Sequence, residues 1–230
     1  EKRKKLVVYI NPPYAEATSA KTITGTGENK KGVATQYKSS EYFNTKIGNA
    51  SNELFALFMS QVYERIPNCY LAQFSKVKFI QGTNFIKFRE FFKAKYYRGF
   101  IVPADSFDNV KGNFPIGFTI WNLKTTKIIE DITCDIYNKN VEKIGVKSFY
   151  GNMPSSINKW IKKYENPELD SIGLMVSAAP DFQHNKQLAI LSKQQERYCF
   201  KINQKNLLTF SVYFAVRHCI EATWINDRDQ

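Results

Sequence analysis

The chain has 230 residues, 43% of them hydrophobic, which is enough for one large domain with a buried core or for a domain and a half. Its formal net charge is +12, from 33 Lys and Arg against 21 Asp and Glu. This excess favours a polyanionic partner, either nucleic acid or an anionic membrane, although a lysine-rich soluble protein would have the same composition.

Cysteine and histidine usage excludes several classes of site. The four cysteines lie far apart with no C-x-x-C pair, which excludes a zinc ribbon and a disulfide framework and favours a reducing cytosolic environment. His184 and His218 have no partner at ligand spacing, so we interpret both as structural and expect no metal site. No apolar stretch is long enough to span a membrane, so we expect a soluble, cytoplasmic protein with no membrane partner.

The N-terminal part of the chain begins with an apolar segment that stops abruptly. Residues 6–10, Leu-Val-Val-Tyr-Ile, show no alternation and predict a strand buried on both faces, as in a parallel sheet. The strand ends in Asn-Pro-Pro-Tyr, residues 11–14. Residues 15–50 are polar, with many Gly, Ser and Thr, and predict a long loop.

Strand and helix patterns then alternate. We expect a helix over 53–66 that Ser51 or Asn52 caps, a strand over 69–80, and a helix over 84–95. The segments "YRGFIVPADSF" and "FPIGFTIWNL" predict two strands joined by the turn "DNVKGN". This alternation predicts an α/β fold with a largely parallel sheet that an antiparallel edge closes.

The regular alternation of strand and helix patterns stops after Leu123, and we place a domain boundary there, between 1–123 and 124–230. Beyond it, "KIIEDITCDIYNKN" resembles a strand, "MPSSINKWIKKYEN" predicts a capped amphipathic helix, and "IGLMVSAAP" predicts a short strand. An apolar helix follows in "NLLTFSVYFAVRHCIEATW". We therefore expect a mixed α+β region after the α/β segment.

The residues Asn11-Pro12-Pro13-Tyr14 suit the recognition of an exocyclic amine. Methyl transfer to the amino group of adenine is difficult because its lone pair is delocalised into the ring, and two fixed acceptors would localise that pair. The Asn11 side-chain oxygen and the Pro12 backbone oxygen provide two acceptors, and the prolines fix φ and add no competing donor. Tyr14 would stack on a base flipped out of the duplex, worth about 1–3 kcal/mol. The alternative is a Pro-rich turn that simply ends a strand.

Residues 6–123 resemble the N6-adenine DNA methyltransferases of bacterial restriction–modification systems, through this motif after a strand and the order of elements up to Trp121. The resemblance implies that 1–123 is the second half of a Rossmann-like catalytic domain. It also implies that 124–230 is similar to the variable, target-recognition region of certain single-chain modification enzymes. Catalysis would involve Asn11, Pro12, Pro13 and Tyr14, with S-adenosylmethionine as cofactor and double-stranded DNA as substrate.

Further residues are candidates for contacts with DNA. The resemblance implies that an aromatic side chain packs on the other face of the flipped base, with Phe114 the first candidate and Phe107 the second. A Phe at a strand end can equally belong to the core. Lys111 lies near Phe114 and is a candidate for a phosphate contact, as are Lys87 and Arg89 in a basic, aromatic-rich segment. A solvated surface explains these three cations equally well.

The cofactor-binding motif of the family is missing. That family binds S-adenosylmethionine chiefly through a Phe-x-Gly-x-Gly loop and an acidic residue, and only ten residues precede Asn11. Phe149 and Gly151 have the right spacing, but Met153 stands where the second glycine should be, and no strand leads into "TGTGENKKG". We expect a fragment that is inactive alone and whose partners are the missing N-terminal part of the enzyme or a restriction or specificity subunit.

Two other functions remain open. The chain could be a non-catalytic DNA-binding or specificity module in which the motif is a structural relic. Alternatively, the same loop could serve an RNA methyltransferase or a protein-glutamine methyltransferase. The net charge and the variable region after residue 123 favour DNA.

Overall fold

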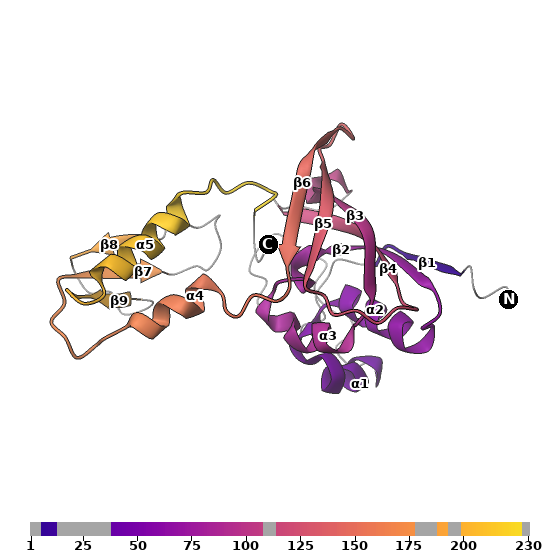
Figure 1. The fold of residues 1–230 in the computed structure, drawn as a ribbon, viewed down its shortest axis with the longest axis horizontal. Helices are drawn as coiled ribbons and strands as arrows, with labels where there is room; N and C mark the ends of the chain where they lie inside the picture. The colour runs from indigo at the N-terminus through magenta and orange to yellow at the C-terminus, as the bar shows by residue number, and fades with distance from the viewer. Residues whose placement is uncertain (1–5, 13–37, 108–113, 178–187, 193–198, 227–230) are drawn as a thin grey trace. The chain divides into compact units, whose positions relative to one another are not determined.

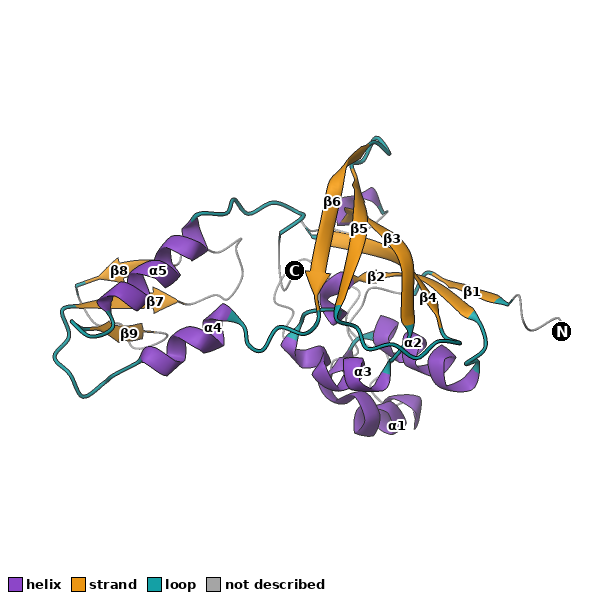
Figure 2. Ribbon diagram, in the orientation of Figure 1, coloured by secondary structure: helices purple, strands orange, loops and turns teal. Residues whose placement is uncertain are grey.

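The computed structural model describes residues 6–12, 38–107, 114–177, 188–192 and 199–226. The chain divides into two compact units, Glu1–Asn152 and Met153–Asp229. Figures 1 and 2 show the helices and strands of each unit. None of the described helices has the length and hydropathy that crossing a bilayer requires.

The first unit is built on a six-stranded mixed sheet with the order β1-β2-β4-β3-β5-β6. The strands are β1 (Val7–Ile10), β2 (Tyr70–Lys76), β3 (Lys95–Pro103), β4 (Pro115–Asn122), β5 (Asp131–Tyr137) and β6 (Lys143–Tyr150). Strand β1 is parallel to β2 and β3 is parallel to β5, while β4 pairs antiparallel with β2 and β3. Strand β6 pairs antiparallel with β5.

The helices of this unit lie in the connections between the strands. They are α1 (Lys38–Ile47), α2 (Leu54–Arg65) and α3 (Ile86–Phe91), with 3₁₀ turns η3 (Gly48–Asn52), η4 (Val77–Phe79), η5 (Thr83–Phe85) and η6 (Ala104–Ser106). Helix α2 forms where its apolar periodicity predicts and ends before Pro67, which disfavours helix in the residue before it. Its side chains are buried almost all round, because it contacts α1 as well as β2.

One face of the sheet is covered by these helices, and we call it the helix-covered face. Trp121 of β4 is fully buried there, with its ring 5.3–6.0 Å from those of Phe79, Phe92 and Tyr96. Gln73 of β2 points to the same face and donates a hydrogen bond of 3.3 Å from Nε2 to the backbone oxygen of Phe55 in α2. These contacts fix the helical layer to the middle of the sheet.

The opposite face carries a row of aromatic rings, and we call it the aromatic face. Neighbouring rings on it lie 4.8–6.4 Å apart and reach from β1 across β2, β4 and β3 to β5. The row consists of Tyr9, Phe74, Phe118, Phe100 and Tyr137. The two faces of the sheet therefore differ in what covers them.

The second unit is a smaller α+β structure. Its antiparallel sheet has the order β8-β7-β9, formed by β7 (Gly173–Ser177), β8 (Leu188–Leu191) and β9 (Cys199–Ile202). It also contains α4 (Ile157–Trp160), η7 (Ile161–Tyr164) and α5 (Leu207–His218). The core consists of Ile161, Met175, Leu188, Ile202, Phe210 and Tyr213.

The α/β prediction is confirmed at the level of a mixed sheet with helices, followed by a mixed α+β unit. Helix α5 and the helix at 157–164 form as expected, and the Ser156 side chain caps α4 by accepting from the Lys159 backbone N–H at 3.3 Å. Helix α2 is preceded instead by Glu53, with no side-chain capping bond.

Three expectations about the first unit are wrong. Strand β1 is not buried on both faces: it is an edge strand, with Val7 58% and Tyr9 64% exposed. The antiparallel strand β4 lies between β2 and β3 rather than at the edge. The last part of the predicted loop, from residue 38, forms α1 and η3, because Phe43 and Ile47 are buried in the helical layer.

The chain passes from the first unit to the second between residues 152 and 153, whereas the boundary expected from the sequence lies between 123 and 124. Strands β5 and β6 lie beyond the sequence boundary but belong to the first unit, because β5 pairs with β3 in the same sheet. The change in the sequence pattern after Leu123 coincides with the start of the hairpin of β5 and β6, which protrudes from the rest of the unit (Figure 1).

Close packing behind β4 gives a stability prediction. A Cβ at Gly117 would collide with the Val77 side chain, while a Cβ at Gly145 of β6 would meet only Ile136 Cδ1 at 3.7 Å. Gly117→Ala should destabilise the first unit by about 1–3 kcal/mol through overpacking. The matched change Gly145→Ala should stay within about 1 kcal/mol of the parent. Urea unfolding followed by tryptophan fluorescence measures both, and equal midpoints for the two variants would contradict the packing described here.

Candidate functional site

Asn11 and Pro12 follow the carboxyl end of β1. The last residue of the strand, Ile10, pairs with Gln73 of β2, so the motif begins beside the final residues of β2. Asn11 is exposed and Pro12 is buried, so the asparagine lies at the surface directly beyond the end of the strand. Pro13 and Tyr14 lie outside the described residues.

Both candidate stacking residues lie at the same edge of the sheet as Asn11. Strands β1, β2 and β3 are parallel and end at this edge, which we call the carboxyl edge, and β4 begins there. Phe107 follows β3 through η6, and Phe114 immediately precedes β4. Pairing of Pro103 with Pro115 and a 2.9 Å bond from Ala104 N–H to the Phe114 oxygen hold the two segments together.

Phe107 is connected to β1 through the aromatic face. Its ring lies 5.4 Å from that of Phe74, which in turn lies 6.4 Å from Tyr9, two residues before Asn11. Phe107 and Phe114 are both half-buried, so each ring keeps some accessible surface. Ligands in open α/β sheets bind outside the carboxyl ends of the strands, which is where these residues gather.

A buried ion-pair cluster, which the sequence pattern does not reveal, supports this edge. Glu53, just before α2, is 6% exposed, and its Oε1 lies 2.5 Å from Lys78 Nζ and its Oε2 3.5 Å from Lys76 Nζ. This cluster fixes the start of α2 to the end of β2, because removing one partner would leave a buried charge uncompensated. Its only sequence signals are an acidic residue directly before a helix and a Lys-x-Lys pair that begins at the last residue of a strand.

The basic candidates are placed differently from one another. Arg89 donates from Nη1 to the backbone oxygens of Phe79 and Gly82, at 3.0 and 2.9 Å, and burial lowers the pKa of its guanidinium. Arg89 thus serves to hold the turn between η4 and η5. Lys87 of α3 is exposed at the surface of the helical layer. Lys111 lies outside the described residues.

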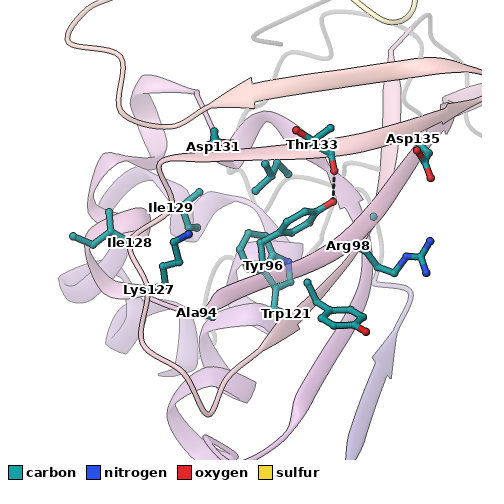
Figure 3. A pocket seen from close by; sticks show the side chains of 13 residues that line it. Ala94, Tyr96, Arg98, Trp121, Lys127, Ile128, Ile129, Asp131, Thr133 and Asp135 are labelled. Carbon is teal, nitrogen blue, oxygen red and sulfur yellow. Dashed lines mark hydrogen bonds between the residues drawn. The ribbon is translucent and has the colours of Figure 1, made fainter.

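A cavity of about 460 Å³ lies at the opposite end of the parallel strands (Figure 3). Strands β3 and β5 pair only through Phe100 and Ile101 with Asp135 and Ile136, and they separate toward their amino ends. The lining residues are Ala94, Tyr96, Tyr97, Arg98, Gly99, Trp121, Lys127, Ile128, Ile129, Asp131, Ile132, Thr133 and Asp135. The sequence did not reveal this cavity, because it results from the divergence of two strands that are distant in sequence.

Tyr96 bridges the gap between the two strands. Its hydroxyl donates to the backbone oxygen of Thr133 at 2.7 Å and lies 3.4 Å from Cys134 Sγ. A Cβ at Gly99 would lie 2.9 Å from this hydroxyl and 2.5 Å from the Phe118 oxygen, so only glycine allows the ring to lie there. Burial raises the pKa of Tyr96 and raises the pKa of Cys134 to about 11, so both groups are protonated at neutral pH.

Among the described residues, no three His, Cys, Asp or Glu side chains form a group that could hold a metal ion. Comparison of the chain with protein-family models and with curated proteins finds no match. The candidate site is therefore defined by its own geometry: Asn11 and Pro12 lie at the carboxyl edge of the sheet, the edge at which Phe107 and Phe114 also lie.

The contribution of the Tyr96 bridge to stability can be measured with Tyr97, the next residue in the sequence, as the control position. Tyr96→Phe removes the hydrogen bond to Thr133 and should lower the free energy of unfolding by about 0.5–1.5 kcal/mol. Tyr97 is 65% exposed, so Tyr97→Phe should change it by less than about 0.5 kcal/mol. Chemical denaturation of the three proteins gives the comparison, and an unchanged stability for Tyr96→Phe would show that the bridge contributes nothing.

A half-buried lysine on β6, Lys147, gives a pH prediction. Burial lowers the pKa of Lys147 to about 8, while an unfolded lysine titrates near its usual value of about 10.4. The folded state therefore binds fewer protons between these two values, and this lysine makes stability rise with pH across that window. Lys147→Met should stabilise the protein by about 1–2 kcal/mol at pH 7, and its advantage should shrink from pH 8 to 10. Unfolding curves at pH 7, 8.5 and 10 measure this, and a constant difference would contradict it.

Proposed function

We propose that this chain is part of an S-adenosylmethionine-dependent methyltransferase that modifies adenine N6 in DNA within a bacterial restriction–modification system. The supporting observation is the position of Asn11 and Pro12 at the carboxyl end of a strand that is parallel to β2. Phe107 and Phe114, selected from the sequence as stacking residues, lie at the same edge. A turn that only ended a strand would not require this combination.

The sheet supports the finer proposal that the first unit is the second half of a Rossmann-like catalytic domain. Three strands, β1, β2 and β3, run parallel, and α2 and α3 lie in the two connections between them. The antiparallel β4 inserts between β2 and β3. Parallel strands with helical connections, interrupted by one antiparallel strand, agree with the half-domain expected from the resemblance.

The candidate cofactor loop at Phe149 and Gly151 does not fit the cofactor, and the segment with Gly25 and Gly27 lies outside the described residues. Gly151, the better candidate for a cofactor loop, is packed against backbone: its N–H donates to the Glu130 oxygen at 2.6 Å, and a Cβ there would lie 2.5 Å from the Ile129 oxygen. Phe149 is fully buried. Both lie at the end of β6, near the start of β5, rather than at the carboxyl edge. We therefore propose that this chain holds the base, and that the main cofactor loop comes from elsewhere in the enzyme.

In this proposal the residues of the carboxyl edge bind and orient a flipped adenine. The Asn11 side-chain oxygen and the Pro12 backbone oxygen accept the two hydrogens of the amino group, which localises the nitrogen lone pair for attack. Tyr14 and either Phe107 or Phe114 would stack on the two faces of the base. Direct transfer of a methyl group requires no nucleophilic side chain of the protein.

The +12 charge favours DNA as the polyanionic substrate. A non-catalytic DNA-binding module with the same fold is the second candidate. The two differ in the role of one side chain, because only catalysis needs the amide oxygen of Asn11. Substitution of Asn11 therefore separates them.

The test uses the complete protein expressed in a bacterial host that lacks adenine methylation. Asn11→Ala should reduce N6-methyladenine in genomic DNA by about 100-fold or more, the size of effect seen when one preorganised hydrogen-bonding group is removed from an active site. Asn52→Ala, at an exposed position in the helical layer, is the matched control and should methylate normally. Mass spectrometry of digested DNA measures the product, and gel-shift assays should show unchanged DNA binding. Full methylation by Asn11→Ala would refute the catalytic role and favour the binding module.

A further inference from the structure

The hairpin of β5 and β6 makes its turn at the carboxyl edge of the sheet. Strand β5 runs parallel to β3, so the two strands end on the same side, and the hairpin protrudes there (Figure 1). Lys139 in the turn forms an ion pair with Asp105 of η6, with 2.6 Å between Nζ and Oδ2. Asp105 lies two residues before Phe107, one of the two candidate stacking residues. The turn therefore adjoins a segment that we propose to contact a flipped base.

One asparagine side chain closes this turn. Asn138 Oδ1 accepts hydrogen bonds from the backbone N–H groups of Asn140 and Glu142, at 2.9 and 3.0 Å, and Asn138 Nδ2 donates to Glu142 Oε2 at 2.7 Å. Backbone bonds also join the Val141 N–H to the Asn138 oxygen at 3.1 Å and the Asn138 N–H to the Glu142 oxygen at 3.0 Å. Together these bonds fix the conformation of residues 138–142.

Val141, at the tip of the turn, has an unfavourable backbone conformation and an exposed side chain. Its φ is +63°, in the left-handed region, where glycine and asparagine are the usual residues and a β-branched side chain is strained. Among the described residues it is the only one other than glycine with a positive φ. Its side chain is 80% exposed, so packing within the unit does not offset the strain. Strain of this kind clusters at functional sites, which indicates that the valine contacts a partner.

We propose that Val141 enters the DNA duplex and fills the space that the target adenine leaves when it flips out. This inference rests on the proposed function and adds the residue that takes the place of the adenine in the base stack. Extruding a base costs the stacking and pairing that it loses, and an apolar side chain inserted between base steps stabilises the unstacked duplex. A turn that is already fixed loses little conformational freedom when it inserts such a side chain.

The position of the turn relative to Asn11 suits this role. In the order β1-β2-β4-β3-β5, four strand spacings of about 4.8 Å separate β1 from β5, which places the turn on the order of 20 Å across the sheet from Asn11. A flipped base rotates by about 180° around its backbone, so its pocket and the gap that it leaves lie on opposite sides of one DNA strand. Asn11 and Val141 would contact these two sides.

The surroundings of Val141 favour insertion between bases over two other kinds of contact. Its neighbours within the turn, residues 138–140 and 142, are polar, so the tip presents a single apolar group. A protein interface buries about 800 Å² on each partner around an apolar centre, which one valine does not provide. The two lysines nearest in sequence form ion pairs with aspartates of the same unit, at 2.6 and 2.7 Å, so their charge is already balanced and does not favour a phosphate contact.

Fluorescence of 2-aminopurine, placed in duplex DNA instead of the target adenine, tests the proposal with the complete protein, because this base brightens when it leaves the stack. Val141→Asn should reduce the fluorescence rise at saturating protein about tenfold, since the apolar group is lost. It should not lower the midpoint of thermal unfolding, because asparagine adopts a positive φ more readily than valine. The matched control is Val146→Asn, on β6 of the same hairpin and 55% exposed, which should stay within about twofold of the parent.

A second DNA substrate separates insertion from a structural role. A mismatch at the target lowers the cost of flipping, so Val141→Asn should recover most of the fluorescence rise on mismatched DNA. A loss that the mismatch does not restore, or that accompanies a lower unfolding midpoint, would show that the valine only maintains the turn.

The remaining outcomes distinguish this inference from the proposed function. Equal fluorescence for the parent and Val141→Asn would overturn the insertion of Val141 and leave the proposed function intact, because the parent would still flip the base. No fluorescence rise with the parent itself would refute base flipping, and the insertion of Val141 would be refuted with it.

Discussion

The parallel pairing of β1 with β2 is the constraint on which the candidate site depends. This pairing directs the end of β1 to the edge where β2 and β3 also end and where β4 begins. If β1 ran antiparallel to β2, Asn11 and Pro12 would leave the sheet at its opposite end, away from Phe107 and Phe114. The four residues of β1 thus decide which other side chains can share a site with the motif.

The unequal covering of the two faces of the sheet is the second general feature. On the helix-covered face, aromatic rings, a buried tryptophan and the Glu53 ion pairs fix α2 and the following turns to the central strands. On the aromatic face the rings pack against one another and leave Tyr9 at the margin exposed. Together these contacts fix the helical layer to the central strands behind the candidate site.

Local patterns in the sequence predicted the elements that have strong periodicity or clear caps. Helices α2 and α5 and the Ser156 cap were predictable because apolar spacing and a capping serine act within a few residues. Helix α1 was not, since only Phe43 and Ile47 of its ten residues are buried and its polar residues resemble the preceding loop. The proximity of Phe107 and Phe114 followed from the expected pairing of the two strands that they flank.

Properties that depend on distant parts of the chain could not be predicted. A continuous apolar run such as residues 6–10 is the same for a central strand and for an edge strand, because the sequence does not show what lies beside it. The hydrogen bonds of Arg89 to two loop carbonyls depend on how η4 and η5 fold back toward α3. The cavity depends on where β3 and β5 stop pairing, and the bridging role of Tyr96 and the need for glycine at position 99 both follow from that gap.

The most direct test of the account is to locate a flipped base on the protein. Duplex DNA that carries 5-iodouracil in place of the target adenine is bound to the complete protein and irradiated, and the crosslinked peptide is identified by mass spectrometry. The account predicts linkage to the Asn11–Tyr14 motif or to the segments that contain Phe107 and Phe114. Linkage only to the second unit, or to strands of the aromatic face away from the carboxyl edge, would contradict it.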